Sequence, residues 1–259
     1  MGSRGIASYN TPDRRPPSKK SLPTPFVRGF RTLLGEALGS IDEQSDKPLR
    51  SCIGVYAFYD YDNEPIYVGQ TTENFGTRVG RHLTGQRSDT LAYRILDPFE
   101  VAAMELWPLE GARALPSAEK RAAVDALEYS VYLSAIGRSK YKAILNEKIP
   151  PVSAPVELPV SYRFPLVSED MREDREHPDI RIARRAETLA RVAAVAHERG
   201  EVSSGLRRVI VIQAVRLADL AAARLAYAEG RSRPAAHAFD VQELVGGVLA
   251  EYDDYDEDV

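Results

Sequence analysis

The sequence predicts an α+β protein, in which a small mixed or antiparallel sheet is flanked by helices and followed by a helical C-terminal region. Three observations predict it. Alternating residues with a turn between them occupy 53–69, which is typical of a β-hairpin. A helical pattern begins at 117, directly after a proline. Beyond a proline-rich stretch, alanine, leucine and arginine recur at helical spacing from 179 onward.

The composition is that of an ordinary globular protein, with 259 residues, 44% hydrophobic and 28% charged. No window approaches the roughly 18 apolar residues of a membrane span, and the first twenty residues hold no apolar signal core. We therefore expect a cytoplasmic protein without membrane contact. The single cysteine, Cys52, excludes an internal disulfide, and with scattered histidines it makes no zinc cluster.

Charge is distributed unevenly along the chain. The net charge of −4 includes six acids in the last nine residues, so the remaining chain carries +2. Residues 1–50 are also positive, with nine Lys/Arg against five Asp/Glu. This asymmetry is compatible with a polyanionic partner.

Proline and charge mark the boundaries between regions. Repeated prolines after 150 exclude regular helix and central strand, which makes this stretch the best boundary. The predicted regions, in order, are a flexible basic arm (1–24), an N-terminal helix (25–50), a mixed α/β domain (51–150), a Pro-rich linker (151–178), a helical region for recognition or dimerisation (179–252) and an acidic tail (253–259).

Two tyrosines distinguish the predicted hairpin. In "IGVYAFYD" the apolar residues alternate, so Tyr56 faces away from Val55. The partner strand is "PIYVG", with "DYDNE" as the turn. A turn centred between Tyr61 and Asp62 places Tyr56 directly opposite Tyr67, with both phenols on one face of the sheet.

The next segment, "TTENFGTRVGRHL", predicts a short helix. Arg78 and His82 are four residues apart and therefore share one helix face, while Arg81 lies nearer to a neighbouring stripe. The candidate N-terminal caps are Thr71, Thr72 and Asn74.

A longer helix is predicted in "SAEKRAAVDALEYSVYLSAIG", with Ser117 as its cap. Glu128 interrupts an apolar stripe that includes Val124, Val131 and Ala135. A carboxylate in such a position needs a cation, a hydrogen-bond donor or a metal, since an unpaired buried charge is too costly.

Together these residues resemble the GIY-YIG nuclease domain. The resemblance covers 51–148 and consists of "GVY" at 54–56, "YVG" at 67–69, the arginine and histidine four apart, the glutamate on a later helix and the asparagine after it. Five elements in the right order are more specific than either short motif alone. The family's two isoleucines are Val55 and Val68 here. The resemblance implies a small sheet flanked by helices that cleaves phosphodiesters with one divalent metal ion.

The resemblance also assigns roles to individual residues. It makes Tyr56 the general base, Tyr67 its neighbour that orients water and phosphate, Arg78 the ligand of the scissile phosphate, His82 the acceptor of the phenol proton, Glu128 the ligand of Mg²⁺ (or Mn²⁺) and Asn146 a supporting residue. A phenol has a pKa near 10, so acting as a base near neutral pH calls for nearby positive charge or a proton acceptor. A one-residue shift of helix register would place Arg81 instead of Arg78 at the phosphate.

Basic residues outside these motifs are candidate DNA contacts. They are Arg81, Arg87, Arg138, Lys140 and Lys142. The last three belong to "GRSKYKAIL", which is equally compatible with a charged helix end that faces solvent.

The predicted function is a sequence-specific double-strand DNA endonuclease of restriction or phage-defence type. A homodimer on DNA would cut both strands, and a cognate methyltransferase is a possible partner that protects host DNA. Two alternatives stay open: a structure-specific nuclease of DNA repair or recombination, and a non-catalytic DNA-binding protein that keeps the fold.

Overall fold

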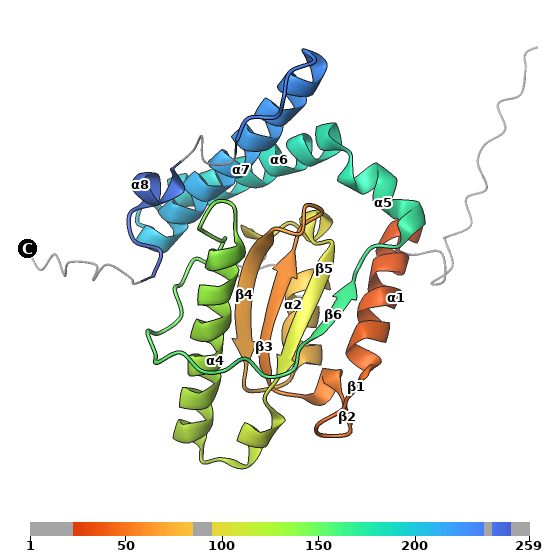
Figure 1. The fold of residues 1–259 in the computed structure, drawn as a ribbon, viewed down its shortest axis with the longest axis vertical. Helices are drawn as coiled ribbons and strands as arrows, with labels where there is room; N and C mark the ends of the chain where they lie inside the picture. The colour runs from red at the N-terminus through yellow and green to blue at the C-terminus, as the bar shows by residue number, and fades with distance from the viewer. Residues whose placement is uncertain (1–22, 85–94, 236–239, 250–259) are drawn as a thin grey trace, which may run out of the picture.

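A four-stranded antiparallel sheet forms the centre of the protein (Figure 1). The computed structural model describes residues 23–84, 95–235 and 240–249. The strands lie in the order β4-β3-β5-β6, with bounds β3 Gly54–Tyr59, β4 Pro65–Thr71, β5 Ala103–Pro108 and β6 Tyr162–Pro165. The predicted α+β class is confirmed.

Helices cover the sheet on several sides. In Figure 1, α2 lies behind the sheet, α4 flanks β4, and α6 and α7 cross above one end of the strands. The helices are α1 Pro25–Gly39, α2 Phe75–Thr84, α4 Ser117–Arg138, α5 Glu169–Glu176, α6 Pro178–Arg199, α7 Ser204–Ala228 and α8 Val241–Val245. Short elements are β1 Ile41–Asp42, β2 Lys47–Pro48, η1 Leu49–Ser51, η2 Pro98–Glu100 and η3 Glu110–Ala114.

The core is centred on β3, whose six residues are all buried. This strand has a hydrogen-bonded neighbour on each side. Val55, Ala57 and Tyr59 therefore point to one face and Tyr56 and Phe58 to the other, and both faces are covered. The alternation seen in the sequence thus does not separate a core face from a solvent face.

The register of the hairpin differs from the prediction. Tyr56 pairs with Gly69 instead of Tyr67, and Tyr67 pairs with Phe58. The pairing then shifts by one residue between Phe58 and Tyr59. The two phenols are consequently diagonal neighbours on one face, with ring centroids 6.3 Å apart.

The hairpin connection explains the shift. The side chain of Asp60 accepts hydrogen bonds from the backbone N–H groups of Asp62 (2.9 Å) and Glu64 (3.1 Å). Asn63 adopts a positive φ of 61° within this loop. The connection is the predicted segment "DYDNE", but Asp60 holds it in a conformation centred later in the chain than the predicted point between Tyr61 and Asp62.

The stretch 151–178, expected as a Pro-rich linker, contains a strand and a helix. β6 pairs with β5 at the open edge of the sheet and ends at Pro165, so its proline obstructs no further pairing. Before β6 the chain runs along α4, where the backbone N–H of Val156 donates to Ser130 Oγ at 2.8 Å. Prolines here exclude a central strand but not an edge strand.

Several predicted helix limits also differ. α4 begins at Ser117 without a side-chain cap, whereas Asn74 Oδ1 caps α2 by accepting from Thr77 N at 2.7 Å. The helix predicted up to 252 is the five-residue α8, capped by Asp240. Residues 1–22, Arg87 and the acidic tail lie outside the described residues. In the described part of the chain, no helix is long and apolar enough to cross a membrane.

Candidate active site

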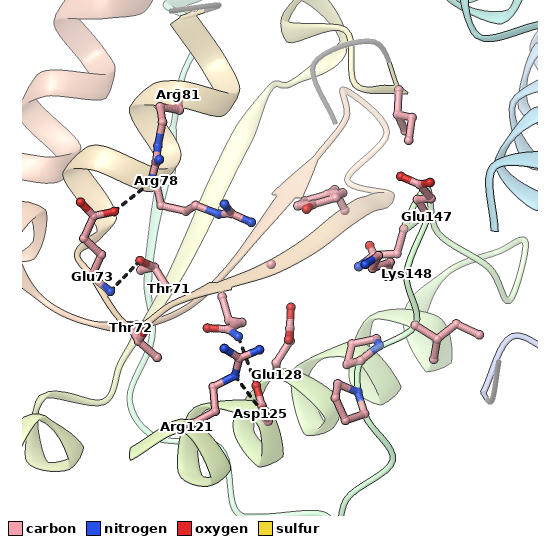
Figure 2. A pocket seen from close by; sticks show the side chains of 18 residues that line it. Thr71, Thr72, Glu73, Arg78, Arg81, Arg121, Asp125, Glu128, Glu147 and Lys148 are labelled. Carbon is pink, nitrogen blue, oxygen red and sulfur yellow. Dashed lines mark hydrogen bonds and ion pairs between the residues drawn. The ribbon is translucent and has the colours of Figure 1, made fainter. Parts of the chain in front are cut away.

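A cleft of about 630 Å³ opens between β4, α2, α4 and the segment that follows Leu145 (Figure 2). Four of the predicted site residues line it, namely Tyr67, Arg78, Glu128 and Asn146. The other two, Tyr56 and His82, lie buried beneath Tyr67. The fold therefore gathers all six from five parts of the chain, namely β3, β4, α2, α4 and the segment that follows Leu145.

The two motif glycines make room for this packing. A Cβ at Gly69 would lie 2.6 Å from the hydroxyl oxygen of Tyr56, because the tyrosine ring lies across the glycine on the neighbouring strand. Gly54 has a φ of +147°, and a Cβ there would meet the carbonyl oxygen of Trp107 at 2.1 Å. Both positions require glycine for steric reasons.

Tyr56 and His82 form a buried pair. The hydroxyl of Tyr56 lies 3.4 Å from Nε2 of His82. Burial raises the pKa of Tyr56 to about 12, although the positive charge of Arg78 opposes the shift. Burial, together with the charges of Arg78 and Arg81, lowers the pKa of His82 to about 4. The imidazole is therefore neutral at pH 7 and free to accept a proton.

Glu128 projects from α4 into the cleft (Figure 2). Burial and the charge of Asp125 raise its pKa to about 8, while Arg78 and Arg121 lower it. Among the described residues, no group donates a hydrogen bond to this carboxylate. A carboxylate in this state gains from a nearby cation, and one carboxylate with several waters is a common way to hold a divalent metal. The donor set fits such an ion.

Asp125 lies one helical turn before Glu128 and was not predicted. It accepts hydrogen bonds from Gln70 Nε2 at 3.1 Å and from Arg121 Nε at 3.2 Å. All three residues line the cleft. The spacing of Arg121, Asp125 and Glu128 on one helix face is the sequence signal that identifies them. Lys148, which also lines the cleft, follows Asn146 in a loop without any such signal.

The two candidate arginines of α2 differ in their contacts. Arg81 donates to Glu73 Oε2 at 2.8 Å and to the carbonyl oxygen of Thr77 at 3.2 Å. Arg78 instead interacts with the Tyr56 hydroxyl, and Tyr56, Tyr67 and Glu128 raise its pKa against the effect of burial. Arg78 is therefore the arginine next to the tyrosines.

Asn146 stabilises the edge of the sheet by hydrogen bonding to strand β4. Its Oδ1 accepts from the backbone N–H of Val68 at 3.0 Å, and its Nδ2 donates to the carbonyl of Val68 at 2.8 Å. The backbone N–H of Leu145 also donates to the carbonyl of Ile66 at 2.8 Å. The amide thus replaces the missing neighbour of edge strand β4 next to Tyr67.

The three basic residues predicted after α4 lie elsewhere. Arg138 donates to the hydroxyl of Tyr59 at 2.9 Å, Lys140 to Asp219 at 2.9 Å and Lys142 to the carbonyl of Gly137 at 2.7 Å. None of the three lines the cleft. The chain leaves α4 at Arg138 and turns, with Lys142 at a φ of 51°.

Comparison with known families adds one finding. Residues 52–112 match the model of the GIY-YIG catalytic domain, a stretch that includes both glycine motifs and α2 and ends before Glu128. No curated protein and no solved structure gave a match. Over residues 52–112 the chain is thus similar to the GIY-YIG catalytic domain.

Proposed function

We propose that the protein is a metal-dependent endonuclease that cuts both strands of DNA at a specific sequence, of the restriction or phage-defence kind. The observation that supports it most is the convergence of Tyr67, Arg78 and Glu128 on one cleft, with Tyr56 and His82 buried directly behind Tyr67. These groups supply a proton acceptor, a phosphate ligand and a metal ligand within one site, which phosphodiester hydrolysis requires.

In the proposed reaction, Arg78 binds the scissile phosphate through its planar guanidinium. Arg78 interacts with the Tyr56 hydroxyl, and Tyr56 is fully buried. Turning Arg78 toward a phosphate would uncover this hydroxyl for the attacking water. The water would then give a proton to Tyr56 as the phenol proton passes to Nε2 of neutral His82. The water oxygen would bond to phosphorus as the bond from phosphorus to the leaving oxygen breaks, and the leaving oxygen would take a proton from solvent. Tyr67, on the cleft wall, orients the water and the phosphate.

Glu128 would hold the divalent ion, Mg²⁺ or Mn²⁺, with Asp125 next to it. When bound, the ion neutralises charge on the phosphate and on the leaving oxygen. Its positive charge also favours ionised Glu128, whose pKa is otherwise raised to about 8.

One cleft cuts one strand, so we propose that a homodimer forms at least on DNA and cuts both strands at a symmetric site. The helical region after 179 is our proposal for the recognition or dimer contacts. A restriction enzyme also implies a methyltransferase that protects the host DNA.

Digestion of unmethylated plasmid and phage DNAs with Mg²⁺ tests the proposal. We expect discrete fragments from the wild type that disappear with EDTA and in Glu128→Ala and Tyr56→Phe. Cleavage only of branched DNA would replace sequence specificity with the structure-specific alternative. Tight binding to DNA with no cleavage of any substrate would favour the non-catalytic alternative.

A further inference from the structure

A second cavity, of about 230 Å³, lies between α1, the C-terminal end of α2, η2, α5 and α6. Its lining combines aromatic rings with arginines, so we call it the aromatic-arginine pocket. It is defined by Phe26, Phe99, Arg31, Arg175, Arg184 and Arg191. None of these residues lines the cleft that holds Glu128.

The wall of this pocket is a stack of aromatic rings beneath a buried cation. Phe26 and Phe99 stack with centroids 4.6 Å apart, at an interplanar angle of 20°. The guanidinium of Arg175 lies 4.0 Å from the centroid of Phe26 and 4.6 Å from that of Phe99. Its Nη2 donates to the carbonyl of Pro98 at 3.2 Å.

Arg175 is 6% exposed, and its Nε and Nη1 find no hydrogen-bond acceptor within the described ranges. Burial lowers its pKa to about 10. A buried guanidinium with two unmet donors next to an open cavity favours an anionic or acceptor-rich ligand there.

Positive charges outnumber negative ones in the pocket lining. Asp97 is its acidic residue, and Arg184 already binds it through two hydrogen bonds of 2.8 Å. Arg31 and Arg191 are exposed, and Arg191 donates to the hydroxyl of Thr188 at 3.2 Å. With four arginines against this one carboxylate, the pocket lining carries a net positive charge.

α2 connects this pocket with the catalytic cleft. Arg78 and Arg81 line the cleft, whereas Leu83 and Thr84 line the pocket. Six residues of helix separate Arg78 from Thr84, which is about 9 Å along the axis. That length corresponds to two or three base steps of a DNA strand.

We propose that the aromatic-arginine pocket binds one unpaired nucleotide of the DNA substrate, with its base against Phe26 and its phosphate at the arginines, since Phe99 is already contacted by Phe26 and by the guanidinium of Arg184. This inference rests on the proposed nuclease function and adds a substrate feature to it. Stacking on aromatic rings combined with phosphate binding by arginine is the usual chemistry of unpaired nucleotide recognition.

Binding of two labelled duplexes in Ca²⁺ tests the proposal, one fully paired and one with a single extra unpaired nucleotide. We expect the wild type to bind the second about tenfold more tightly, the value of one stacked base. Phe26→Ala and Arg191→Gln should lose this preference. Arg199→Gln is the matched control, because it makes the same change on an exposed residue of α6 outside the pocket. Equal binding of both duplexes by the wild type would overturn the proposal.

Photocrosslinking locates the nucleotide independently of affinity. With 5-iododeoxyuridine at the unpaired position, we expect attachment to peptides that contain Phe26 or Phe99. Attachment only to residues elsewhere, including 1–22 or 85–94, would overturn the pocket assignment. Cleavage of paired DNA in Mg²⁺ separates the two hypotheses: if it occurs without a preference for the unpaired nucleotide, this inference alone fails. If no DNA is bound or cut, the proposed function fails too.

Discussion

The candidate active-site cleft and the contact between the hairpin and the C-terminal helices differ in how their buried carboxyl groups are paired. In the cleft, Glu128 receives no hydrogen bond from the described residues. At the contact, Oδ2 of fully buried Asp60 is bound by three arginines of α6 and α7. These are Arg181 at 3.3 Å, Arg185 at 3.0 Å and Arg216 at 2.8 Å.

The difference distinguishes ion pairs that stabilise the fold, such as those of Asp60, from a carboxyl group such as Glu128 that is placed to bind a ligand. Arg185 also binds Glu100 at 2.7 Å and donates to the carbonyl of Arg216 at 2.9 Å, so its charge is fully engaged within the protein. The cost of burying Asp60 is offset by these partners. The charges of Arg78 and Arg121 offset the burial of Glu128 only in part, because its pKa stays raised to about 8, so a further cation would stabilise its ionised form.

Glu128→Gln should produce the largest effect on activity and almost none on stability. If Glu128 holds the metal ion as proposed, its loss removes several kcal/mol of transition-state stabilisation, so we expect a fall in cleavage rate of about a thousandfold or more. The unfolding free energy should stay the same or rise, because a poorly compensated carboxylate is removed. Single-turnover cleavage and urea denaturation measure the two quantities.

Glu119→Gln provides the control for this experiment. It makes the same change on an exposed residue of α4, one that does not line the cleft. If Glu128→Gln destabilised the protein as strongly as a substitution of Asp60, the distinction between the two regions would be wrong.

Asp60→Ala should produce the largest effect on stability. It leaves three buried guanidinium groups without their shared carboxylate and also removes the acceptor that closes the hairpin loop. We expect a loss of about 3–5 kcal/mol in the free energy of unfolding. Asp62→Ala is the comparison, since the Asp62 side chain is 36% exposed and binds Arg181 alone among these arginines. A loss below about 1 kcal/mol for Asp60→Ala would contradict the proposed role.

The same contrast explains what the sequence could predict. The sequence alone could predict the two motifs, Glu128 and the helix of Arg78 and His82, because each follows a local periodicity. Asn146 followed from the resemblance, but its hydrogen bonds to Val68 come from a distant strand. The α+β class followed from the same patterns.

Contacts between residues that lie far apart in the chain could not be predicted from the sequence. Asp60 appeared only as a turn residue, and its arginine partners lie more than a hundred positions away. For the same reason Lys140, expected to contact DNA, binds Asp219 of α7. Residues whose partner is set by tertiary packing give no signal in a single sequence.

His82 predicts how stability depends on pH. Its pKa is about 4 in the folded protein and near 6.5 in the unfolded chain. The unfolded state therefore binds the proton first, and folding stability should fall by about 3 kcal/mol between pH 6.5 and pH 4, with no contribution above pH 6.5. His82→Gln should flatten this part of the curve, measured by urea denaturation at several pH values. An unchanged slope would show that His82 is not held neutral by burial.

The smallest effect on DNA affinity should come from substituting the basic residues that lie away from the cleft. Lys142 is exposed, and among the described residues its ammonium donates only to the carbonyl of Gly137. We expect Lys142→Ala to leave DNA affinity unchanged within about twofold, whereas Arg121→Ala, at the cleft, should weaken binding and lower its salt dependence. Fluorescence anisotropy in Ca²⁺ at two salt concentrations measures both. Equal losses of DNA affinity in the two variants would indicate that the DNA also contacts the loop after α4.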